Sequence, residues 1–468
     1  MNEYDKSFLV RKILELGYEV DPEVIEYLCF GRTLQEALHL VNQILKYKQT
    51  IDPFNKYISG SDFVSLNFKN EQQYVTDKEV KDRYEILFDS SSSIIVPNEP
   101  GSYLDYLKSR FEAVNAILKE RLDWKEVTPI GSINHIAKRS RLKIKVCGLV
   151  YDKVLDKKTS YLTIEDGTGS IKLSVSATFF NKVKEFLLDE FIIVTLDIKE
   201  GQFDVISVNH LDTAPVNGKR ADEDVYAVFL SDLRVGNKNF DRESWDNFSL
   251  WINKKIGESN IVSRVKYVVI VGDLIDNTDI SNYRITDQYR LLYELIQQIP
   301  KDIKVFLIPG ERDATRYALP QPAIPRIFAK ELYNLKNVVM LGNPSYISLH
   351  GVSVLVYHGQ SLDDVKRQLI TVNDEIKVTD LMVSLLKARH LAPSLGMSTA
   401  IAPDRNDLLV INTVPDIFVC GHINQGGVDF YKGSLLLNCC SWIRNQKHVK
   451  QGKVALVNLR TFDVLWRI

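Results

Sequence analysis

The chain has 468 residues, of which 59 are Lys or Arg and 60 are Asp or Glu, so its formal net charge is −1. At roughly 150 residues per domain this length predicts about three domains, and a composition that is 45% apolar and 25% charged excludes a wholly disordered chain. Because the charges cancel, strong attraction of the whole molecule to nucleic acid or to anionic membranes is also excluded, so any contact with DNA needs a local patch or a partner.

The N-terminus and the cysteines both indicate an intracellular protein. No apolar run approaches the ~20 residues that a membrane span needs, and the first residues mix acids and bases where a signal peptide would be apolar. The five cysteines include no Cys-x-x-Cys pair, which is typical of a reducing compartment and argues against a zinc ribbon. We therefore expect a cytoplasmic location and no membrane partner.

Residues 1–50 are expected to form a small helical module. The first helix precedes Asp21-Pro22, which begins the second, and Thr33 with Glu36 forms a capping box for the third. Three short helices build only a tiny core. An interaction module and a packing appendage of the main body are therefore equally good interpretations.

Residues 51–100 lose this periodicity and end in a serine run and two prolines, which is typical of a linker. Residues 101–140 lead from the linker into the next domain and begin with a helix that Ser102 caps. One side of this helix is predicted to be apolar and the other charged. The apolar side consists of Tyr103, Leu104, Leu107, Phe111, Val114 and Leu118.

Residues 141–215 change to about five short β-rich runs, two of which are joined by an Asp-Gly-Thr-Gly turn. This pattern resembles an OB-fold barrel, a fold often used for single-stranded nucleic acid. The densest basic run of the chain leads into the barrel and includes Lys138, Arg139, Arg141 and Lys143. These side chains are candidates for contacts with DNA phosphates, and a solvated barrel face is the alternative interpretation.

From residue 222 onward, short apolar runs repeatedly end in a residue that can bind a metal. The runs span residues 226–232, 267–273, 305–311, 352–358 and 417–422, and they end at Asp232, Asp273, Glu311, His358 and His422. Continuous apolar runs of this length are typical of central strands that are buried on both faces. Because residues at the carboxyl ends of such strands converge at one edge of an α/β sheet, we expect a site there.

These motifs, in the order Asp, Gly-Asp-x-x-Asp, Pro-Gly-x-x-Asp, His-Gly and Gly-His, resemble the calcineurin-like metallophosphoesterase superfamily. The resemblance implies two metals that activate water for attack on phosphorus, with Asp273 at the position of the bridging carboxylate. The expected fold class is therefore α/β: a calcineurin-like metallophosphoesterase sandwich over residues 222–468, preceded by an OB-fold β-barrel and a small N-terminal helical module.

The order of the domains and the motifs in the second half narrow this resemblance. The runs are His358-Gly-Gln-Ser-Leu-Asp-Asp364, Lys387-Ala-Arg-His-Leu-Ala-Pro393 and Val414-Pro-Asp-Ile-Phe418. They resemble the small subunits of the archaeal family D DNA polymerases, which are related to the B-type accessory subunits of the eukaryotic replicative polymerases. The resemblance implies a large catalytic polymerase subunit as partner, DNA bound largely through the complex, a nucleoid-associated location and a 3′–5′ exonuclease in the small subunit. The N-terminal helices are candidates to bind other replisome proteins.

The metal positions that the resemblance implies are only partly kept. At the first position Asp232 and Asp273 remain, but Arg234 and Asn424 replace the two family histidines. A guanidinium only donates hydrogen bonds and adds a fixed positive charge where a cation should lie, so Arg234 cannot be a ligand.

At the second position Asp273, His358 and His422 remain, and Glu311 replaces an asparagine as an oxygen ligand. Arg312 replaces the family's catalytic histidine, and Asp313 follows it in the same motif. We therefore expect one divalent metal (Mn, Mg or Zn) or none.

These departures predict an accessory polymerase subunit whose exonuclease is weakened or lost, with Arg234 paired to Asp232 in place of an ion. The first alternative is an active metal-dependent exonuclease with a reduced metal site, in which Arg312 stabilises the phosphoryl charge. A degenerate phosphoesterase with a binding role outside replication is the second alternative.

Overall fold

The computed structural model describes residues 3–20, a few positions between 25 and 58, and residues 81–467 with internal gaps. The gaps are residues 96–101, 121–126, 137–141, 157–159, 200–201, 217, 278–283, 370–375 and 445–453. The chain divides into two units, Met1–Glu79 and Val80–Ile468, and each is described by itself.

The first unit contains the helix α1 (Glu3–Glu15) and the short parallel strands β1 (Glu19–Val20) and β2 (Tyr57–Ile58). Leu9 and Ile13 lie on the buried side of α1, which confirms the first helix of the predicted module. The second and third predicted helices lie largely outside the described residues.

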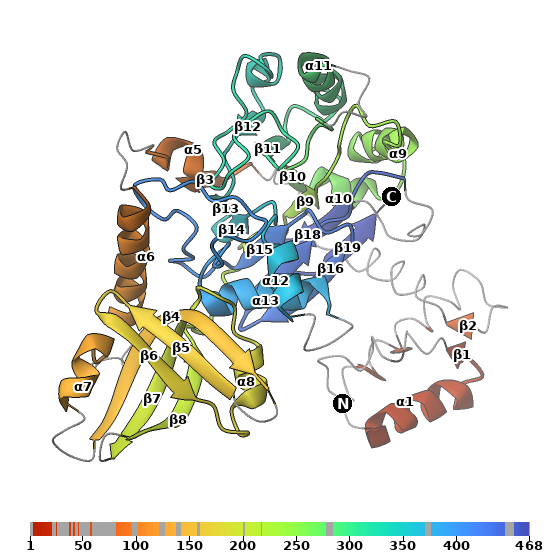
Figure 1. Cartoon of the computed structure of the whole chain (residues 1–468). Coiled ribbons are helices and arrows are strands. Elements are labelled where there is room, and N and C mark those ends of the chain that lie inside the picture. The colour runs from red at the N-terminus through yellow and green to blue at the C-terminus, as the bar shows by residue number, and fades with distance from the viewer. Residues whose placement is uncertain are drawn as a thin grey trace. The chain divides into compact units, whose positions relative to one another are not determined.

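The second unit contains two six-stranded mixed sheets among its described residues (Figure 1). The first sheet has the order β12 (Val338–Met340), β11 (Lys304–Ile308), β10 (Val265–Val271), β9 (Tyr226–Leu230), β18 (Val454–Asn458) and β19 (Val464–Arg467). The second has the order β16 (Gly427–Tyr431), β17 (Ser434–Asn438), β15 (Ile417–Cys420), β14 (Val352–Val356), β13 (Ser345–Leu349) and β3 (Tyr84–Asp89). The five predicted apolar runs form β9, β10, β11, β14 and β15, which confirms the α/β class.

The main core lies between these two sheets, because one apolar cluster contains side chains from both of them. Phe229, Val269 and Phe306 come from the first sheet, and Val354 and Val419 come from the second. All five are fully buried, as expected for strands that are covered on both faces.

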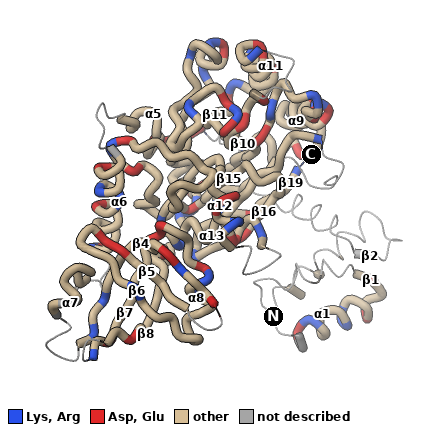
Figure 2. The backbone as a smooth tube through the Cα atoms, viewed as in Figure 1, with Lys and Arg blue, Asp and Glu red and all other residues tan. Residues whose placement is uncertain are grey.

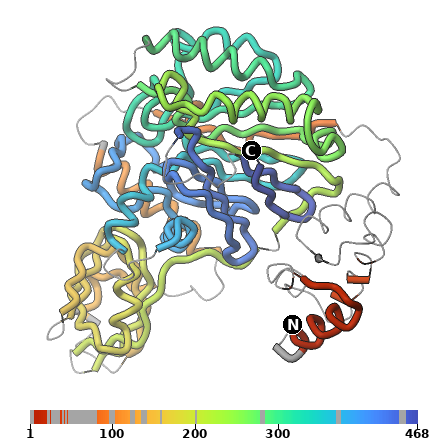
Figure 3. Tube along the Cα trace, turned by 90° about the vertical axis from the view of Figure 1, so that its right-hand side faces the viewer, coloured from red at the N-terminus to blue at the C-terminus, as the bar shows by residue number. Residues whose placement is uncertain are grey.

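Helices cover the outer faces of this sandwich (Figures 1 and 3). The first sheet carries α9 (Arg242–Ile252), α10 (Ser259–Ser263), α11 (Ile285–Ile296) and the 3-10 turn η2 (Leu332–Asn334) in its connections. On the second sheet, α12 (Leu362–Leu369) and α13 (Val378–Ala388) pack their apolar sides against β14, β15 and β17.

The segment expected to be a linker contains a strand of the second sheet. β3 (Tyr84–Asp89) pairs antiparallel with β13, and the short helix α5 (Ser90–Ser93) follows it directly, with Asp89 as its N-cap. Asp89 also accepts a hydrogen bond from the backbone of Gly342 at 2.8 Å. Residues 84–93 therefore belong structurally to the sandwich, because their backbone groups are paired with it.

The third sheet is antiparallel and has five strands, which confirms the strands predicted for residues 141–215. Its order is β6 (Gly169–Ser174), β5 (Ser160–Asp166), β4 (Leu142–Leu155), β7 (Phe191–Lys199) and β8 (Gln202–His210). The turn η1 (Ile130–Ser132) and the helix α7 (Ile133–Ile136) precede it, and α8 (Phe180–Lys184) lies between β6 and β7. An apolar cluster that includes Val146, Ile164 and Leu196 forms its core.

The predicted helix after the linker is confirmed as α6 (Ser102–Lys119). Its predicted apolar side is buried in its second half, at Val114 and Leu118, but not at its start. Leu104 is 67% exposed, whereas Arg110 is only 1% exposed. Arg110 donates from Nε to Asp407 at 2.6 Å and from Nη1 to the carbonyl of Pro393 at 2.9 Å. The ion pair with Asp407 thus turns a charged residue of α6 towards the sandwich.

Charge and hydropathy along the structure agree with the balanced composition. Figure 2 shows basic and acidic residues interspersed along α6 and around α9 and α11. None of the described helices combines the length and the apolar character that crossing a membrane requires.

Candidate metal centre

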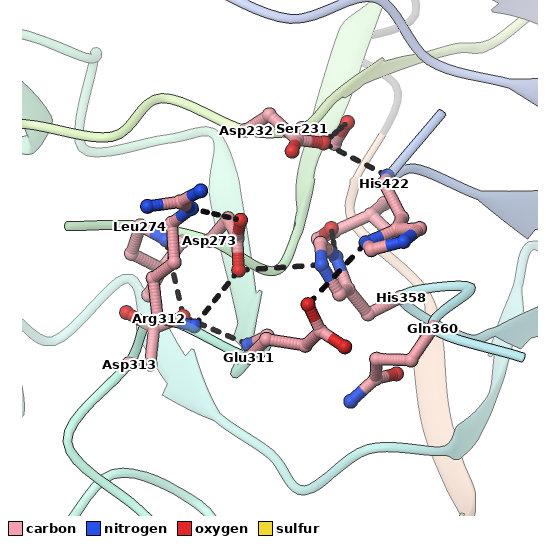
Figure 4. A network of polar contacts seen from close by, with 12 residues as sticks. Ser231, Asp232, Asp273, Leu274, Glu311, Arg312, Asp313, His358, Gln360 and His422 are labelled. Carbon is pink, nitrogen blue, oxygen red and sulfur yellow. Dashed lines mark hydrogen bonds and ion pairs between the residues drawn. The ribbon is translucent and has the colours of Figure 1, made fainter. Parts of the chain in front are cut away.

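The candidate site lies where strands of both large sheets end. β9, β10 and β11 run parallel in the first sheet, and β14 and β15 run parallel in the second. The residues that directly follow these strands include Asp232, Asp273, Glu311, His358 and His422. Figure 4 shows these five side chains facing one another across the strand ends. The sequence prediction that they converge is therefore confirmed.

The backbone at these strand ends adopts a conformation that side chains rarely take. The φ angles are 52° at Asp232, 49° at Arg234, 51° at Asp273 and 65° at His422. A left-handed conformation at a residue other than Gly costs on the order of 1 kcal/mol or more and persists only where its surroundings enforce it. Such residues often lie at functional sites, so their concentration here marks the strand ends as a functional-site candidate.

Two glycines allow the strand ends to approach one another closely. Gly272 has a φ of +77°, and a Cβ there would lie 2.4 Å from Nδ1 of His358. A Cβ on Gly310 would lie 2.4 Å from both the backbone N and Oδ1 of Asp273, and 2.8 Å from Nε2 of His358. Any larger residue at either position would therefore displace Asp273 or His358.

Arg234 lies between two buried carboxylates. Its Nη2 donates to Oδ1 of Asp232 at 2.7 Å, and its Nε lies 3.3 Å from Oδ2 of Asp273. The predicted pairing of Arg234 with Asp232 is thus present. Although burial opposes the charged form, His358 and Arg234 together hold the pKa of Asp273 below its ordinary value.

Arg312 contacts the same carboxylate from the other side. Its Nε lies 3.3 Å from Oδ2 of Asp273, its backbone N donates to Oδ1 at 3.1 Å, and its Nη1 donates to Asp276 at 2.7 Å. Two guanidinium groups therefore share one oxygen of Asp273, which leaves Oδ1 facing His358 (Figure 4).

His358 is fully buried and uses only one of its ring nitrogens for a hydrogen bond. Nδ1 lies 2.8 Å from the carbonyl of Val271 and must carry the proton, because a carbonyl only accepts. Nε2 lies 3.3 Å from Oδ1 of Asp273 and makes no hydrogen bond within the described structure. Burial opposes protonation, but the Asp273 carboxylate outweighs it and raises the pKa of His358 to about 9.

His422 is held in a similar way. Its Nε2 lies 3.0 Å from Oδ2 of Asp363, and its backbone N donates to Asp232 at 2.9 Å. Nδ1 faces Glu311, whose Oε2 is 3.9 Å away, and has no hydrogen-bond partner in the described part of the chain. Nε2 of His358 and Nδ1 of His422 thus both lie at the centre of the site without a hydrogen-bond partner among the described residues.

The buried side chain of Asp313 connects the loops of the site. It accepts hydrogen bonds from the backbone of Leu274, Ile275 and Gly310 and from the hydroxyl of Tyr289. Burial, followed by the charge of Asp273, raises the pKa of Asp313 to about 7. These bonds tie the ends of β10 and β11 to each other.

Two groups of predicted site residues are not brought into this cluster. Asn424 follows β15, but its side chain is exposed. In the basic run before the five-stranded sheet, Lys138, Arg139 and Arg141 lie outside the described residues, and Lys143 is exposed near the start of β4.

The sequence prediction missed the groups that support His358 and His422. Of these groups, Asp363 could have been found from the sequence, since it lies in the motif that begins at His358. No motif marked the buried amides beneath the site. Asn343 accepts from the backbone of His358 at 3.0 Å and donates to Gln321 and Gln360, and Gln321 donates to the carbonyl of Gly310.

One group of ligand atoms in the site lies close enough together to hold a metal ion. Asp232, Asp273 and His358 offer ligand atoms that all lie within 4.8 Å of one another, so they could hold an ion. Arg234, however, already neutralises Asp232 and reaches Asp273. Nε2 of His358 and Nδ1 of His422 lie near Asp273 and Glu311 respectively. The ligand atoms that lie close together thus coincide with the position that the guanidinium of Arg234 occupies.

Comparisons with known proteins relate the chain to DNA polymerase subunits. Residues 227–427 match the family model for the B-type subunits of DNA polymerases alpha and epsilon. The chain is 32% identical over 465 residues to the DNA polymerase II small subunit of Archaeoglobus fulgidus, covering 94% of this chain and 91% of that one. It is 32% identical over 372 residues to the protein of the same name from Methanothermobacter thermautotrophicus, covering 76% and 75% of the two chains.

Among solved structures, one similar chain comes from a study entitled as a characterisation of an archaeal phosphodiesterase. It covers 52% of this chain and 98% of its own length, at 8% identity and a TM-score of 0.30.

Proposed function

This chain belongs to the family of DNA polymerase II small subunits, and from that premise we propose that it binds and stabilises the large catalytic subunit of a replicative DNA polymerase. It is then an accessory subunit in DNA replication, and DNA is bound largely through the complex. A net charge of −1 suits this role, because a chain without a large basic excess contributes little of its own to DNA affinity. Its location is cytoplasmic, with the nucleoid.

The exonuclease that the family implies is impaired in this chain. The observation that supports this is the guanidinium of Arg234, which lies 2.7 Å from Asp232 and 3.3 Å from Asp273. Two-metal phosphoesterase chemistry needs an ion in contact with both of these carboxylates. Loss of one ion removes several kcal/mol of transition-state stabilisation, and each 1.36 kcal/mol lowers the rate about tenfold.

The other residues of the site can act without an ion at the first metal position. Asp273, Glu311, His358 and His422 would hold one divalent ion, which supplies positive charge for a phosphoryl oxygen. Arg312 is 33% exposed and can donate to a phosphate at the same place. Asp313 keeps the loops in place through its bonds to backbone N–H groups.

The five-stranded sheet is proposed to be an OB-fold barrel. Three features support this: the order of its strands, the contact between the edge strands β6 and β8, and the helix α8 between the third and fourth strands. The proposed domains are a helical interaction module over residues 1–50, a linker shortened at its end by β3, a connecting helix over 101–140, the barrel over 141–215 and the phosphoesterase domain over 222–468. The exposed Lys143 is a candidate for DNA contact.

An active exonuclease with a reduced metal site is the second candidate function. It is favoured by Nε2 of His358 and Nδ1 of His422, which have no hydrogen-bond partner among the described residues. In that case Arg312 stabilises the charge that develops on the phosphoryl group.

One purified complex tests both. The two-subunit polymerase is assayed on a single-stranded DNA with a labelled 3′ end, with manganese and with magnesium, beside the complex carrying His358→Ala. We expect the chain to co-purify with a polymerase-sized subunit and the two complexes to degrade DNA equally slowly. Rapid degradation that His358→Ala abolishes would establish the active exonuclease, and a chain that binds no polymerase subunit would contradict the accessory role.

A further inference from the structure

We propose that Tyr317 stacks against the base of the last nucleotide of an unpaired DNA strand, whose phosphates reach Arg312. The proposal deepens the proposed function, because it takes the strand-end cluster as a place where a DNA end is bound, but it requires neither cleavage nor a metal ion. Three features of the described residues support it: the position of Tyr317 beside the cluster, the way its loop is held, and the charges around its ring.

Tyr317 lies beside the cluster, on the loop that begins where β11 ends. Nε2 of Gln321 donates to the carbonyl of Gly310 at 3.1 Å and to the carbonyl of Arg316 at 3.0 Å. One amide thus joins the end of the strand to the residue that directly precedes Tyr317. The loop that it closes contains Arg312, whose guanidinium faces the cluster (Figure 4). The tyrosine is therefore held next to the site.

The loop fixes the backbone on both sides of Tyr317 and leaves the side chain free. The guanidinium of Arg316 donates to both carboxylate oxygens of Asp404, whose side chain is 3% exposed. The backbone N of Leu319 donates to the carbonyl of Ala400 at 2.9 Å. Tyr317 itself is 57% exposed, and its hydroxyl makes no hydrogen bond within the described part of the chain. A ring on a fixed backbone loses little conformational entropy when a flat partner covers it.

The charges around this ring favour a neutral base over a phosphate. The negative charge of Glu311, followed by partial burial and by the charge of Asp364, raises the pKa of Tyr317, so its hydroxyl stays uncharged at neutral pH. The same two carboxylates repel a phosphate, whereas a nucleobase carries no charge. Arg312, on the same loop, is 33% exposed and can donate to a phosphate.

An aromatic ring next to a guanidinium fits the end of an unpaired strand. Aromatic side chains bind single-stranded nucleic acid by stacking on its bases, and they accept any base because every base has a π-face. In a duplex the base is already paired and stacked, so binding it in this way costs unpairing and unstacking energy. The arrangement therefore selects unpaired ends without reading their sequence.

Fluorescence anisotropy of the full chain with a short 5′-fluorescein oligothymidylate measures this binding. EDTA is present, so that no strand is cleaved and no ion takes part. Tyr317→Ala is expected to weaken binding at least about fivefold, the lower limit for one stacked base. Tyr317→Phe keeps the ring and should bind like the parent. Tyr103→Ala removes a tyrosine of α6 that is 52% exposed; it is the matched control and should not change the affinity.

The ligand gives a second test of the same contact. A strand whose 3′-terminal nucleotide lacks its base should bind the parent as weakly as the intact strand binds Tyr317→Ala. The two losses should not add, because each removes the same contact. Arg312→Gln should weaken the binding of both strands by the same factor. That loss should shrink as salt is added, whereas the loss in Tyr317→Ala should persist.

A parent chain that does not bind the strand, equal affinities of Tyr317→Ala and the parent, or losses that add in full would each overturn the proposal. So would a Tyr317→Ala chain that binds the strand normally but no longer holds a polymerase subunit, since the ring would then belong to a protein interface. Tyr317 is exposed, so its variants should fold, which circular dichroism checks. Co-purification with a polymerase subunit tests the accessory role separately, so the two failures are distinguishable.

Discussion

Arg234 Nη2 donates to Asp232 Oδ1 across 2.7 Å, although the two residues are only two positions apart in the chain. Both residues have a left-handed backbone, with φ values of 49° and 52°, and this turn brings the guanidinium back over the carboxylate. The ion pair is buried: the side chain of Asp232 is 1% exposed. A strained strand end of a kind that suits a metal ligand therefore holds the guanidinium of Arg234 in this chain. The consequences of this ion pair for activity and stability can be tested.

Replacing Arg234 by methionine should destabilise the metal-free chain. The change keeps the side-chain volume but leaves two buried carboxylates without their partner, for which we expect a loss of about 3 kcal/mol in the free energy of unfolding. Urea denaturation in the presence of EDTA measures it. Arg284→Met, in an exposed pair with Asp287, is the control and should have no measurable effect. Equal midpoints for the Arg234 variant and the parent would show that the ion pair does not stabilise the fold.

Restoring the family residues should restore the exonuclease. The chain carrying Arg234→His, Glu311→Asn, Arg312→His and Asn424→His regains the ligands of two metal positions, so we expect its complex to degrade 3′ ends at least tenfold faster than the parent with manganese. A labelled single-stranded DNA gives the rates. If the two complexes stay equally slow while the variant binds two ions, then something other than the ligand set limits the reaction.

The buried ion pair between α6 and the sandwich should be essential for stability. Asp407→Ala leaves the guanidinium of Arg110 buried without a counter-charge, and removing one partner of such a pair typically costs about 3–5 kcal/mol. Asp105→Ala is the control on α6, the helix of Arg110, because the pair of Asp105 with Lys108 is exposed; we expect a change within about 0.5 kcal/mol. Denaturant titrations compare the variants with the parent, and similar losses for both would contradict the importance of burial.

Stability should also decrease on mild acidification because of His390. Burial, followed by the charge of Arg110, lowers the pKa of His390, although Asp407 acts against this. As the pH falls below about 6.5, the unfolded chain binds a proton at this residue that the folded chain does not, so the free energy of unfolding falls. Below about pH 4 the lowered pKa of Asp407 acts in the same direction.

The variant His390→Gln isolates this contribution, because glutamine can still donate to Asp407. Between pH 7.5 and 5.5 it should lose about 1 kcal/mol less stability than the parent, given a limit of about 1.36 kcal/mol per pH unit for one proton. The same replacement at the exposed His135 should leave the pH dependence unchanged. A parent and a His390 variant with parallel pH profiles would exclude His390 as the cause.

Adding one methyl group at Gly310 should disrupt the site. The Cβ would lie 2.4 Å from the backbone N of Asp273, which cannot move without shifting β10, so we expect a destabilisation of about 1–3 kcal/mol and weaker binding of a divalent metal ion. Gly167→Ala has open space around it and is the control. Urea denaturation measures the loss of stability, and calorimetric titration with MnCl₂ measures the binding of the ion.

The sequence predicts the sandwich and the cluster of acids and histidines well, because both depend on local rules. An apolar run that ends in a ligand is visible without knowing its neighbours, and parallel strands bring such ends together. Three features could not be predicted in this way. β3 buries little of its surface as an edge strand, and the serines that follow it look like a linker.

The two other features depend on partners that are distant in the sequence. The burial of Arg110 on α6 depends on Asp407, which is 297 positions away. The amides of Gln321, Asn343 and Gln360 are ordinary polar residues in the sequence, and only the fold gives them hydrogen-bond partners beneath His358. Asp363 was within reach, since it follows His358 by five positions in a family motif, but a role could be assigned only once His422 was placed beside it.

The position of β3 in the chain also affects how the protein folds while it is being synthesised. It leaves the ribosome early, but the partners of its last residue follow much later: Asp89 accepts from Gly342, 253 positions on. Contacts between such distant positions form slowly, whereas the five-stranded sheet needs only residues 142–210 and can form while the rest of the chain is still being made. Until β13 emerges, the backbone groups of β3 have no strand to pair with. A newborn chain is thus exposed to misassembly at its first sandwich strand for most of its translation.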